Sequence, residues 1–149
     1  MLAHAVRLPA RVAVSDFRDL VCWQLSYEMK CEVLTFTARE KASKDFKYCD
    51  QIRDSSASTP GNIAEGFGRF TPGEFAQYLK WARASLMETM NHLIDGRDRG
   101  YLEPAVYARL MNLARAVLKA TTNLMLQKQR QAAAIRERRA TARRKRRAS

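Results

Sequence analysis

Residues 58–69 read STPGNIAEGFGR, and after Phe70 the chain continues with Thr71-Pro72-Gly73-Glu74. Thr71 is a favourable N-cap residue, and Pro72 suits the first helical position, where no backbone amide is needed. Glu74 stands three residues after Thr71, as in a capping box. We therefore predict that a helix begins at Pro72 and that the residues just before it form a turn between two helices.

The preceding segment, residues 46–67, also has a helical pattern, but it contains Pro60. Proline removes a backbone donor and crowds the turn before it, so we predict a helix that is kinked near residues 58–59 or split there. Gly66 and Gly68 suit a positive φ at the end of this helix. The small side chains of residues 55–58 favour close packing against another helix.

Apolar residues at intervals of three and four define the inward faces of four predicted helices, and residues 39–45 form a charged connection after the first. The predicted faces are Leu20, Trp23, Tyr27, Cys31 and Leu34 for a helix from Ser15 or Asp16 to about Ala38; Phe46, Cys49, Ile52, Ser56, Ile63 and Phe67 for residues 46–67; Phe75, Leu79, Ala82, Leu86, Met90 and Leu93 for the helix that begins at Pro72 and ends before Gly100; and Val106, Leu110, Leu113, Val117, Ala120 and Leu124 for the helix that begins near Pro104.

The predicted fold class is all-α. No segment shows sustained alternation of apolar and polar residues, no Asn-Gly or Asp-Gly hairpin signal occurs, and the connections are short. These features favour an antiparallel up-and-down four-helix bundle. The last helix carries a second apolar stripe, made of Tyr107, Met111, Ala114, Leu118 and Met125. So broad an apolar surface fits either a well-filled core or a homo-oligomer interface, and the sequence leaves both open.

The positive charge of the chain is concentrated at one end. The formal net charge is +12 over 149 residues. Residues 1–15 contribute +2, residues 16–127 contribute +1 and residues 128–149 contribute +9. We therefore predict one domain, the bundle of residues 16–127, with a basic C-terminal extension of residues 128–149 that is either helical or disordered. Residues 1–15 are predicted to be a disordered leader, although their lack of acids also fits an organelle transit peptide.

The basic extension is the predicted ligand-binding segment. Its basic residues repel one another, and an RNA or DNA backbone would relieve that repulsion and release counterions. The predicted nucleic-acid-binding residues are Arg136, Arg138, Arg139, Arg143, Arg144, Lys145, Arg146 and Arg147. A solvated tail, an acidic protein surface and a membrane surface are the alternatives. No aromatic residue lies within the tail, so we expect electrostatic binding with weak sequence selectivity.

The sequence gives little support to metal or catalytic chemistry. It contains two histidines, His4 and His92, and lacks the paired Glu-x-x-His motifs of di-iron bundles. Ser55, Ser56 and Ser58 have no histidine close in sequence to act as a base. No catalytic residue, no metal ligand and no cofactor are therefore predicted.

The cysteines and the hydropathy pattern favour a cytoplasmic protein. Cys22, Cys31 and Cys49 lie in apolar segments and form no C-x-x-C motif, which is typical of reduced thiols. No apolar run approaches the roughly 20 residues needed to cross a bilayer. We predict no membrane span.

One block of the chain resembles a known family. Ser58, Pro60, Asn62, Ile63, Ala64, Glu65, Gly66, Gly68 and Arg69 match a pattern close to S-x-P-x-N-I-A-E-G-x-G-R. This pattern is typical of the four-helix bundle proteins that include the 23S rRNA-intervening sequence proteins and the accessory variability proteins of diversity-generating retroelements. Further matches are Phe17, Leu20, Trp23 and Gln24, then Gln51 and Arg53, Glu74 and Phe75, Tyr78 and Leu79, and Gly100 to Leu102, so the resemblance covers about residues 16–127.

The resemblance implies a bundle that commonly assembles as a ring-like pentamer and has no known enzymatic activity. It also implies that some relatives bind nucleic acid and assist a reverse transcriptase. The block itself has two interpretations. In the structural one, Glu65 and Arg69 pair four residues apart, and Asn62 bonds to backbone freed by Pro60. In the other, Asn62, Glu65 and Arg69 contact a partner or RNA directly.

Taken together, these features predict a non-enzymatic, homo-oligomeric bundle whose basic tail binds RNA or DNA. An RNA element or a reverse transcriptase is the expected context. The alternative is a protein-only scaffold or interaction module with no nucleic-acid role.

Overall fold

The structure is a computed structural model that describes residues 14–148, and every regular element in that range is helical. Most of the predicted leader, residues 1–13, lies outside the described residues. The elements in chain order are a one-turn 3-10 helix η1 (Phe17–Asp19) and the α-helices α1 (Val21–Thr37), α2 (Glu40–Ser43), α3 (Phe46–Phe67), α4 (Pro72–Asp98) and α5 (Pro104–Ala148).

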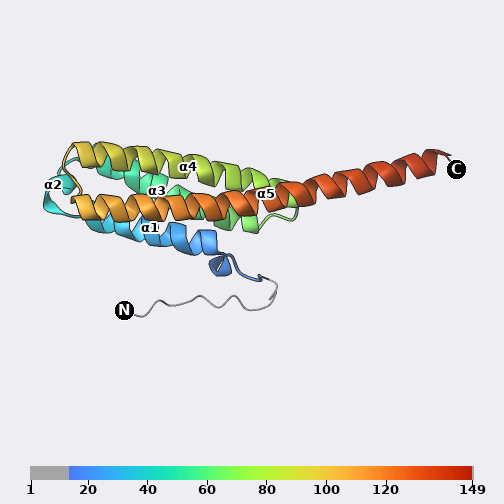
Figure 1. Cartoon of the computed structure of the whole chain (residues 1–149), viewed down its shortest axis with the longest axis horizontal. Coiled ribbons are helices and arrows are strands. Elements are labelled where there is room, and N and C mark those ends of the chain that lie inside the picture. The colour runs from blue at the N-terminus through green and yellow to red at the C-terminus, as the bar shows by residue number, and fades with distance from the viewer. Residues whose placement is uncertain (1–13, 149) are drawn as a thin grey trace.

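The four long helices form an up-and-down bundle (Figure 1). Helix α3 packs against α1 and α4, and α5 packs against the same two helices, so the order around the bundle is α1, α3, α4 and α5. The connections are short, with α2 forming part of the first one. The prediction of an all-α antiparallel four-helix bundle with a basic C-terminal extension is therefore confirmed.

The start of α4 follows the sequence signals closely. Pro72 is its first residue, and the Thr71 hydroxyl accepts a hydrogen bond from the Glu74 amide, with an N to Oγ1 distance of 3.2 Å. The same hydroxyl donates to the Glu74 carboxylate over 2.8 Å. Because the cap fixes where α4 begins, its predicted apolar face points inward, and Phe75, Leu79, Ala82, Leu86 and Leu93 are all buried.

The inward face predicted for the first helix is only partly correct: Leu20 and Trp23 pack against the core, but the other three residues do not. Tyr27 and Leu34 are each 43% exposed, and Cys31 is also exposed. The helix buries a neighbouring face instead, made of Cys22, Ser26, Met29, Val33, Phe36 and Thr37. Two of these residues are polar, and their hydroxyls bond back to carbonyls of the same helix, Ser26 to Trp23 and Thr37 to Val33. The sequence pattern did not reveal this face because hydroxyl residues satisfied in this way occupy core positions.

Helix α1 also begins later than predicted. The chain first forms η1, whose N-cap Asp16 accepts a hydrogen bond from the Arg18 amide over 2.8 Å. Helix α1 then begins at Val21. Asp16 is a helix N-cap, as predicted, but the helix that it caps is η1 and not α1.

Helix α3 runs without a break through Pro60, which excludes the split alternative at residues 58–59 and leaves the kinked one as a prediction. Two other predictions for α3 need correction. Gly66 and Gly68 do not have positive φ, and among the described residues only Gly100 does, at 72°. Phe46, predicted to point inward, is 78% exposed at the first residue of the helix.

Gly66 has a packing role in place of the expected conformational one. A Cβ at this position would lie 2.6 Å from the Tyr78 Cβ and 2.8 Å from Cδ2 of Phe75, both on α4. These distances are shorter than any normal contact, so α3 and α4 approach here as closely as they do because residue 66 has no side chain. Gly61, one helical turn earlier, has nothing within 4 Å of such a Cβ.

Alanine substitutions at the two glycines of α3 should therefore have opposite effects on the free energy of unfolding. Gly66→Ala should lower the free energy of unfolding by about 1–3 kcal/mol, because the new methyl group overpacks the α3–α4 contact. Gly61→Ala should raise it by about 0.5–1 kcal/mol, because alanine favours a helix and meets no neighbour. Urea denaturation followed by circular dichroism measures both. Equal stability of the two variants would contradict the packing role of Gly66.

Candidate nucleic-acid interface

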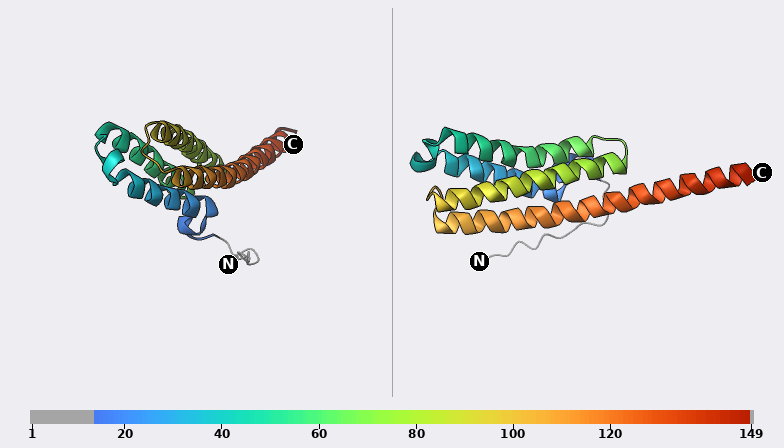
Figure 2. Two further views of the ribbon diagram at one scale, coloured as in Figure 1. Left: turned by 60° about the vertical axis from the view of Figure 1, so that its left-hand side comes forward. Right: turned by 90° about the horizontal axis from the view of Figure 1, so that it is seen from above.

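Helix α5 is much longer than the bundle that it belongs to. Its 45 residues correspond to about 68 Å, and the C-terminal part projects past the end of the other helices (Figures 1 and 2). Met125 is its last buried residue, and every residue from 133 to 148 is exposed. Residues 133–148, about 24 Å of helix, thus pack against little else. We call them the projecting helix.

The basic residues of the projecting helix follow a helical spacing. Arg136, Arg139, Arg143 and Arg147 recur at intervals of three and four and share one face. This face continues the one that holds Met125 and Ala132 nearer the bundle. We call these four residues the arginine stripe. Arg138, Arg144 and Lys145 lie on other faces, and Arg146 lies at the edge of the stripe.

The charge of the projecting helix is almost entirely positive. Glu137 is its one acidic residue, and it lies about 100° around the helix from Arg136. Like charges four residues apart, such as Arg139 and Arg143, destabilise an isolated helix, although cations suit the C-terminal end of the helix dipole. A polyanion along the stripe would remove the repulsion and keep the favourable interaction with the dipole.

The base of the projecting helix lies against the connection between α3 and α4. Phe70 from this connection and Pro72 and Gly73 from the start of α4 line an open hollow together with Ile135, Arg136 and Arg139 of α5. A Cβ on Gly73 would lie 3.8 Å from the Ala132 Cβ, which places the two segments in van der Waals contact. Phe70 also lines a second hollow, together with Phe67, Arg69 and Lys128.

Phe70 was missed by the sequence reasoning. It lies in the turn and belongs to no helical face, so no periodicity singled it out. Its side chain is 101% exposed, more than that of any other large apolar residue described. The signal that was present in the sequence is an aromatic residue between Arg69 and a strong helix start, where a polar turn residue is usual.

Side chains in the N-terminal half of the family-like block form hydrogen bonds inside the bundle. The Asn62 side-chain amide donates to the Ser58 carbonyl over 2.9 Å and contacts the Ser58 hydroxyl at 3.1 Å. The Ser58 hydroxyl lies 2.8 Å from that of Ser85 on α4. Pro60 has no amide to donate to the Ser56 carbonyl. Asn62 bonds to the Ser58 carbonyl instead, so it does not satisfy the carbonyl that Pro60 leaves free.

The C-terminal half of the block forms a second polar group with α4. Arg69 pairs with Glu65 over 3.1 Å, the spacing that the sequence suggested, and also contacts the Tyr78 hydroxyl. The Tyr78 hydroxyl donates to Glu65 over 3.1 Å, and the Arg69 guanidinium lies 4.7 Å from the centre of the Tyr78 ring. Asn62, Glu65 and Arg69 thus have partners within the chain, and of these three only Arg69 lines the hollow beside Phe70.

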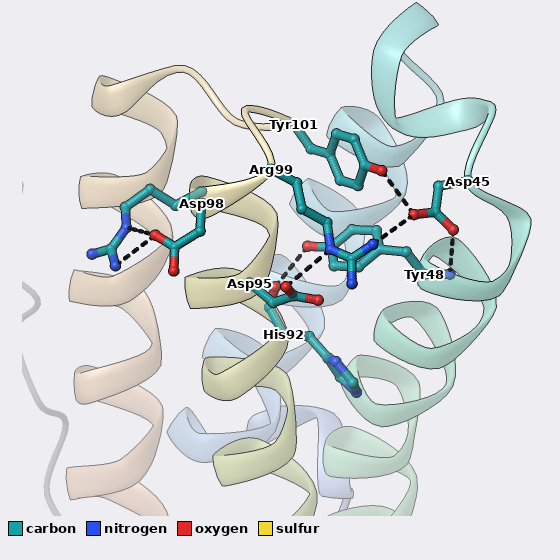
Figure 3. Close-up of polar contacts among 8 residues, drawn as sticks. Asp45, Tyr48, His92, Asp95, Asp98, Arg99 and Tyr101 are labelled. Carbon is teal, nitrogen blue, oxygen red and sulfur yellow. Dashed lines mark hydrogen bonds and ion pairs between the residues drawn. The ribbon is translucent and has the colours of Figure 1, made fainter.

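The opposite end of the bundle carries a polar cluster that joins three segments (Figure 3). The Asp45 carboxylate accepts hydrogen bonds from the Tyr101 hydroxyl over 2.7 Å and from the Tyr48 amide over 3.1 Å. Arg99 pairs with Asp45 over 3.3 Å and with Asp95 over 2.9 Å. The cluster ties the start of α3 to the connection between α4 and α5, so a structural role accounts for the Gly100-Tyr101-Leu102 match.

The described residues form no metal-binding group, and two of the serines of α3 have a packing role. In residues 14–148, no group of three or more His, Cys, Asp or Glu side chains is placed to hold a metal ion. The hydroxyls of Ser55 and Ser56 donate to carbonyls of their own helix, those of Ile52 and Arg53. These serines are buried where α3 packs in the bundle, in line with their small size.

A search for membrane-crossing segments in the described part of the chain gives a negative result: none of its helices combines sufficient length with sufficient apolar character. Helix α5 has the length, but its second half is rich in arginine.

Comparison with known proteins gives a family match and a structural match. Residues 18–123 match the family model of the 23S rRNA-intervening sequence proteins. A crystal structure from Bacteroides thetaiotaomicron, of a protein with unknown function from the S23 ribosomal protein family, superposes with a TM-score of 0.65. It shares 22% identity, and the match covers 70% of this chain and 98% of that one. No curated protein matches. The projecting helix lies beyond the residues that the family model covers.

The Asp45 cluster predicts a pH dependence of stability. The hydrogen bond from Tyr101, then that from the Tyr48 amide and the charge of Arg99, lower the pKa of Asp45 below its ordinary value of about 3.9. A carboxyl whose pKa is lower in the folded state stabilises the fold above its unfolded pKa, and this contribution is lost as the pH falls through the folded pKa. Asp45→Asn should therefore reduce the urea midpoint at pH 5–7, and the difference from the unsubstituted chain should shrink below pH 4.

Asp54, an exposed carboxylate on the same helix, provides the matched control. Asp54→Asn should leave the urea midpoint almost unchanged at every pH. If Asp45→Asn and Asp54→Asn have the same urea midpoint between pH 5 and 7, the Asp45 cluster does not stabilise the fold.

Proposed function

Because the chain belongs to the 23S rRNA-intervening sequence protein family, we propose that it is a non-enzymatic bundle protein that binds nucleic acid through its projecting helix. The observation that carries this proposal is the arginine stripe. Four arginines share one face of an exposed helix, and further basic residues surround it. Phosphate oxygens are the partners that arginine recognises best over an extended surface.

The binding that we propose is electrostatic. The projecting helix places guanidinium groups at successive turns about 5.4 Å apart, so several phosphates of one strand can be contacted together. The projecting helix contains no aromatic, Asn or Gln side chain that could read base edges. The family description refers to 23S rRNA, which supports RNA as the first ligand to test, with DNA as the second.

Self-association is the second part of the proposal. The broad apolar surface of α5 is largely used within one chain: Leu110, Met111, Ala114, Val117 and Met125 are buried. The surface that supports assembly lies elsewhere. Met87 and Ile94, two turns apart on α4, are 43% and 38% exposed, and α1 exposes Tyr27 and Leu34. Several projecting helices in one homo-oligomer would raise the affinity for a long nucleic acid by avidity.

The cellular setting is proposed from the resemblance. A cytoplasmic protein with a ring-like pentameric assembly, beside an RNA element or a reverse transcriptase, fits the family described above. The competing function is a protein-only scaffold, and the binding experiment below separates the two.

Neutralising the tail should abolish nucleic-acid binding. The variant replaces all eight basic residues from Arg136 to Arg147 by glutamine, which has a similar helix propensity, so the helix is retained. Affinity for a single-stranded RNA and for duplex DNA is measured against salt concentration in the full chain. Each lost phosphate contact should reduce the salt slope by about 0.7 for the single strand and about 0.9 for the duplex.

A variant with the seven arginines of this set replaced by lysine is the charge-preserving control. It should keep most of the salt slope. If the glutamine variant binds as tightly as the unsubstituted chain, the tail is not the binding segment. If the unsubstituted chain binds neither RNA nor DNA, the scaffold function replaces the one proposed.

If the chain self-associates through α4, a charged substitution on the exposed face of this helix should reduce the mass of the assembly. Met87→Glu places a carboxylate among exposed apolar side chains, so it should shift the full chain from a multimer to a smaller species in light scattering at micromolar concentration. Asn123→Glu, at an exposed polar position on α5 that lies outside this α4 face, should leave the mass unchanged. A monomeric unsubstituted chain would contradict self-association.

A further inference from the structure

Phe70 stands at the point where the bundle meets the projecting helix. Its ring is fully exposed, while the residues that follow it, Thr71 and Pro72, are fixed by the cap of α4. A side chain that covers nothing in the folded chain contributes little to its stability, and a phenyl ring in water is costly. The backbone at the start of α4 therefore places Phe70 where its ring is open to solvent.

Basic side chains line both of the hollows that Phe70 lines. Arg136 and Arg139 of the arginine stripe line one hollow, and Lys128 lines the other. The Lys128 ammonium lies 5.4 Å from the centre of the Phe75 ring and donates to Gln131 over 3.3 Å, which holds it near the hollow.

The two acidic residues close to Phe70 in sequence, Glu65 and Glu74, line neither hollow. Glu65 is also paired with Arg69. Glu137 lines a different face of α5, together with Arg138 and Lys145. The surface around Phe70 that faces the arginine stripe is thus apolar at its centre and cationic at its edges.

We propose that Phe70 stacks on an unpaired base of a single-stranded nucleic acid whose backbone continues along the arginine stripe. The inference rests on the proposed function and sharpens it, because it names a strand type and a contact that is not electrostatic. An aromatic ring beside a cationic track is the arrangement by which proteins hold single strands, with stacking on the base and pairing with the phosphates.

The geometry favours a single strand over a duplex. In a duplex both faces of each base are covered by neighbouring base pairs, so one exposed ring gains no stacking unless it is inserted between them. An unpaired base offers a free face at no such cost. Phosphates next to that base could pair with Arg136 and Arg139, which line one hollow, and with Lys128, which lines the other.

The test uses the full chain and a short single-stranded RNA that contains 2-aminopurine, whose fluorescence falls when it stacks. The expected result is quenching on binding to the unsubstituted chain and its loss in Phe70→Ala. The affinity of Phe70→Ala for the single strand should fall about 5- to 100-fold, the range for removal of one base-stacking ring. Its affinity for a duplex of the same length should change less than about twofold. A single-stranded DNA of the same sequence should respond in the same way.

Two control variants accompany Phe70→Ala. Phe70→Tyr keeps a ring and should keep both quenching and affinity. Phe46→Ala removes another highly exposed phenyl ring, at the start of α3 and at the opposite end of that helix, and should change neither. Both phenylalanines are exposed, so folding is preserved and is checked by circular dichroism.

The outcomes separate this inference from the proposed function. If Phe70→Ala binds the single strand as tightly as the unsubstituted chain while the glutamine tail variant does not bind, stacking is wrong and the electrostatic function stands. If Phe70→Ala weakens single strand and duplex equally, or changes the mass in light scattering, the ring has another role and the inference is overturned. If the unsubstituted chain binds no nucleic acid, both proposals fail.

Discussion

The close approach of α3 and α4 is the constraint on which much of the molecule depends. At Gly66 the two helices meet at a distance that leaves no room for a methyl group. Farther along the same contact, Ser58 faces Ser85, and Ser55 accepts a hydrogen bond from Thr89. Small residues therefore line this seam over several turns. Because α3 and α4 are held so closely, a short turn joins them, and this turn places Phe70 at a hollow that α5 also lines.

The parts of the fold that could be predicted are those with local chemical signals. The cap at Thr71, Pro72 at the first position of α4 and the regular spacing of Phe75, Leu79 and Leu86 depend on residues close in sequence, and they were predicted correctly. The inward face of α1 was not. Apolar residues occupy two neighbouring faces of that helix, and the choice between them depends on the shapes of α3 and α5, which periodicity does not contain.

The same distinction applies to the candidate site. The basic tail is visible in the sequence because its charge is a property of composition. The glycines of the block were recognised as special, yet their conformation was misjudged, since a glycine that allows close packing looks the same in a sequence as one that allows positive φ. Phe70 could not be placed near Arg136, because only the folded bundle brings residues so far apart in the chain together.

The projecting helix also divides the molecule into two parts with different folding behaviour. Residues 104–132 gain their helical structure mainly from burial in the bundle, whereas residues 133–148 bury almost nothing and depend mainly on local interactions along the helix. We therefore expect amides in the buried part of α5 to exchange with solvent more slowly than amides of the projecting helix, which exchange through fraying of a single helix. Denaturant and heat-capacity measurements therefore report on the bundle, and the arginine-bearing segment is free to order or loosen without any cost to the fold that holds it.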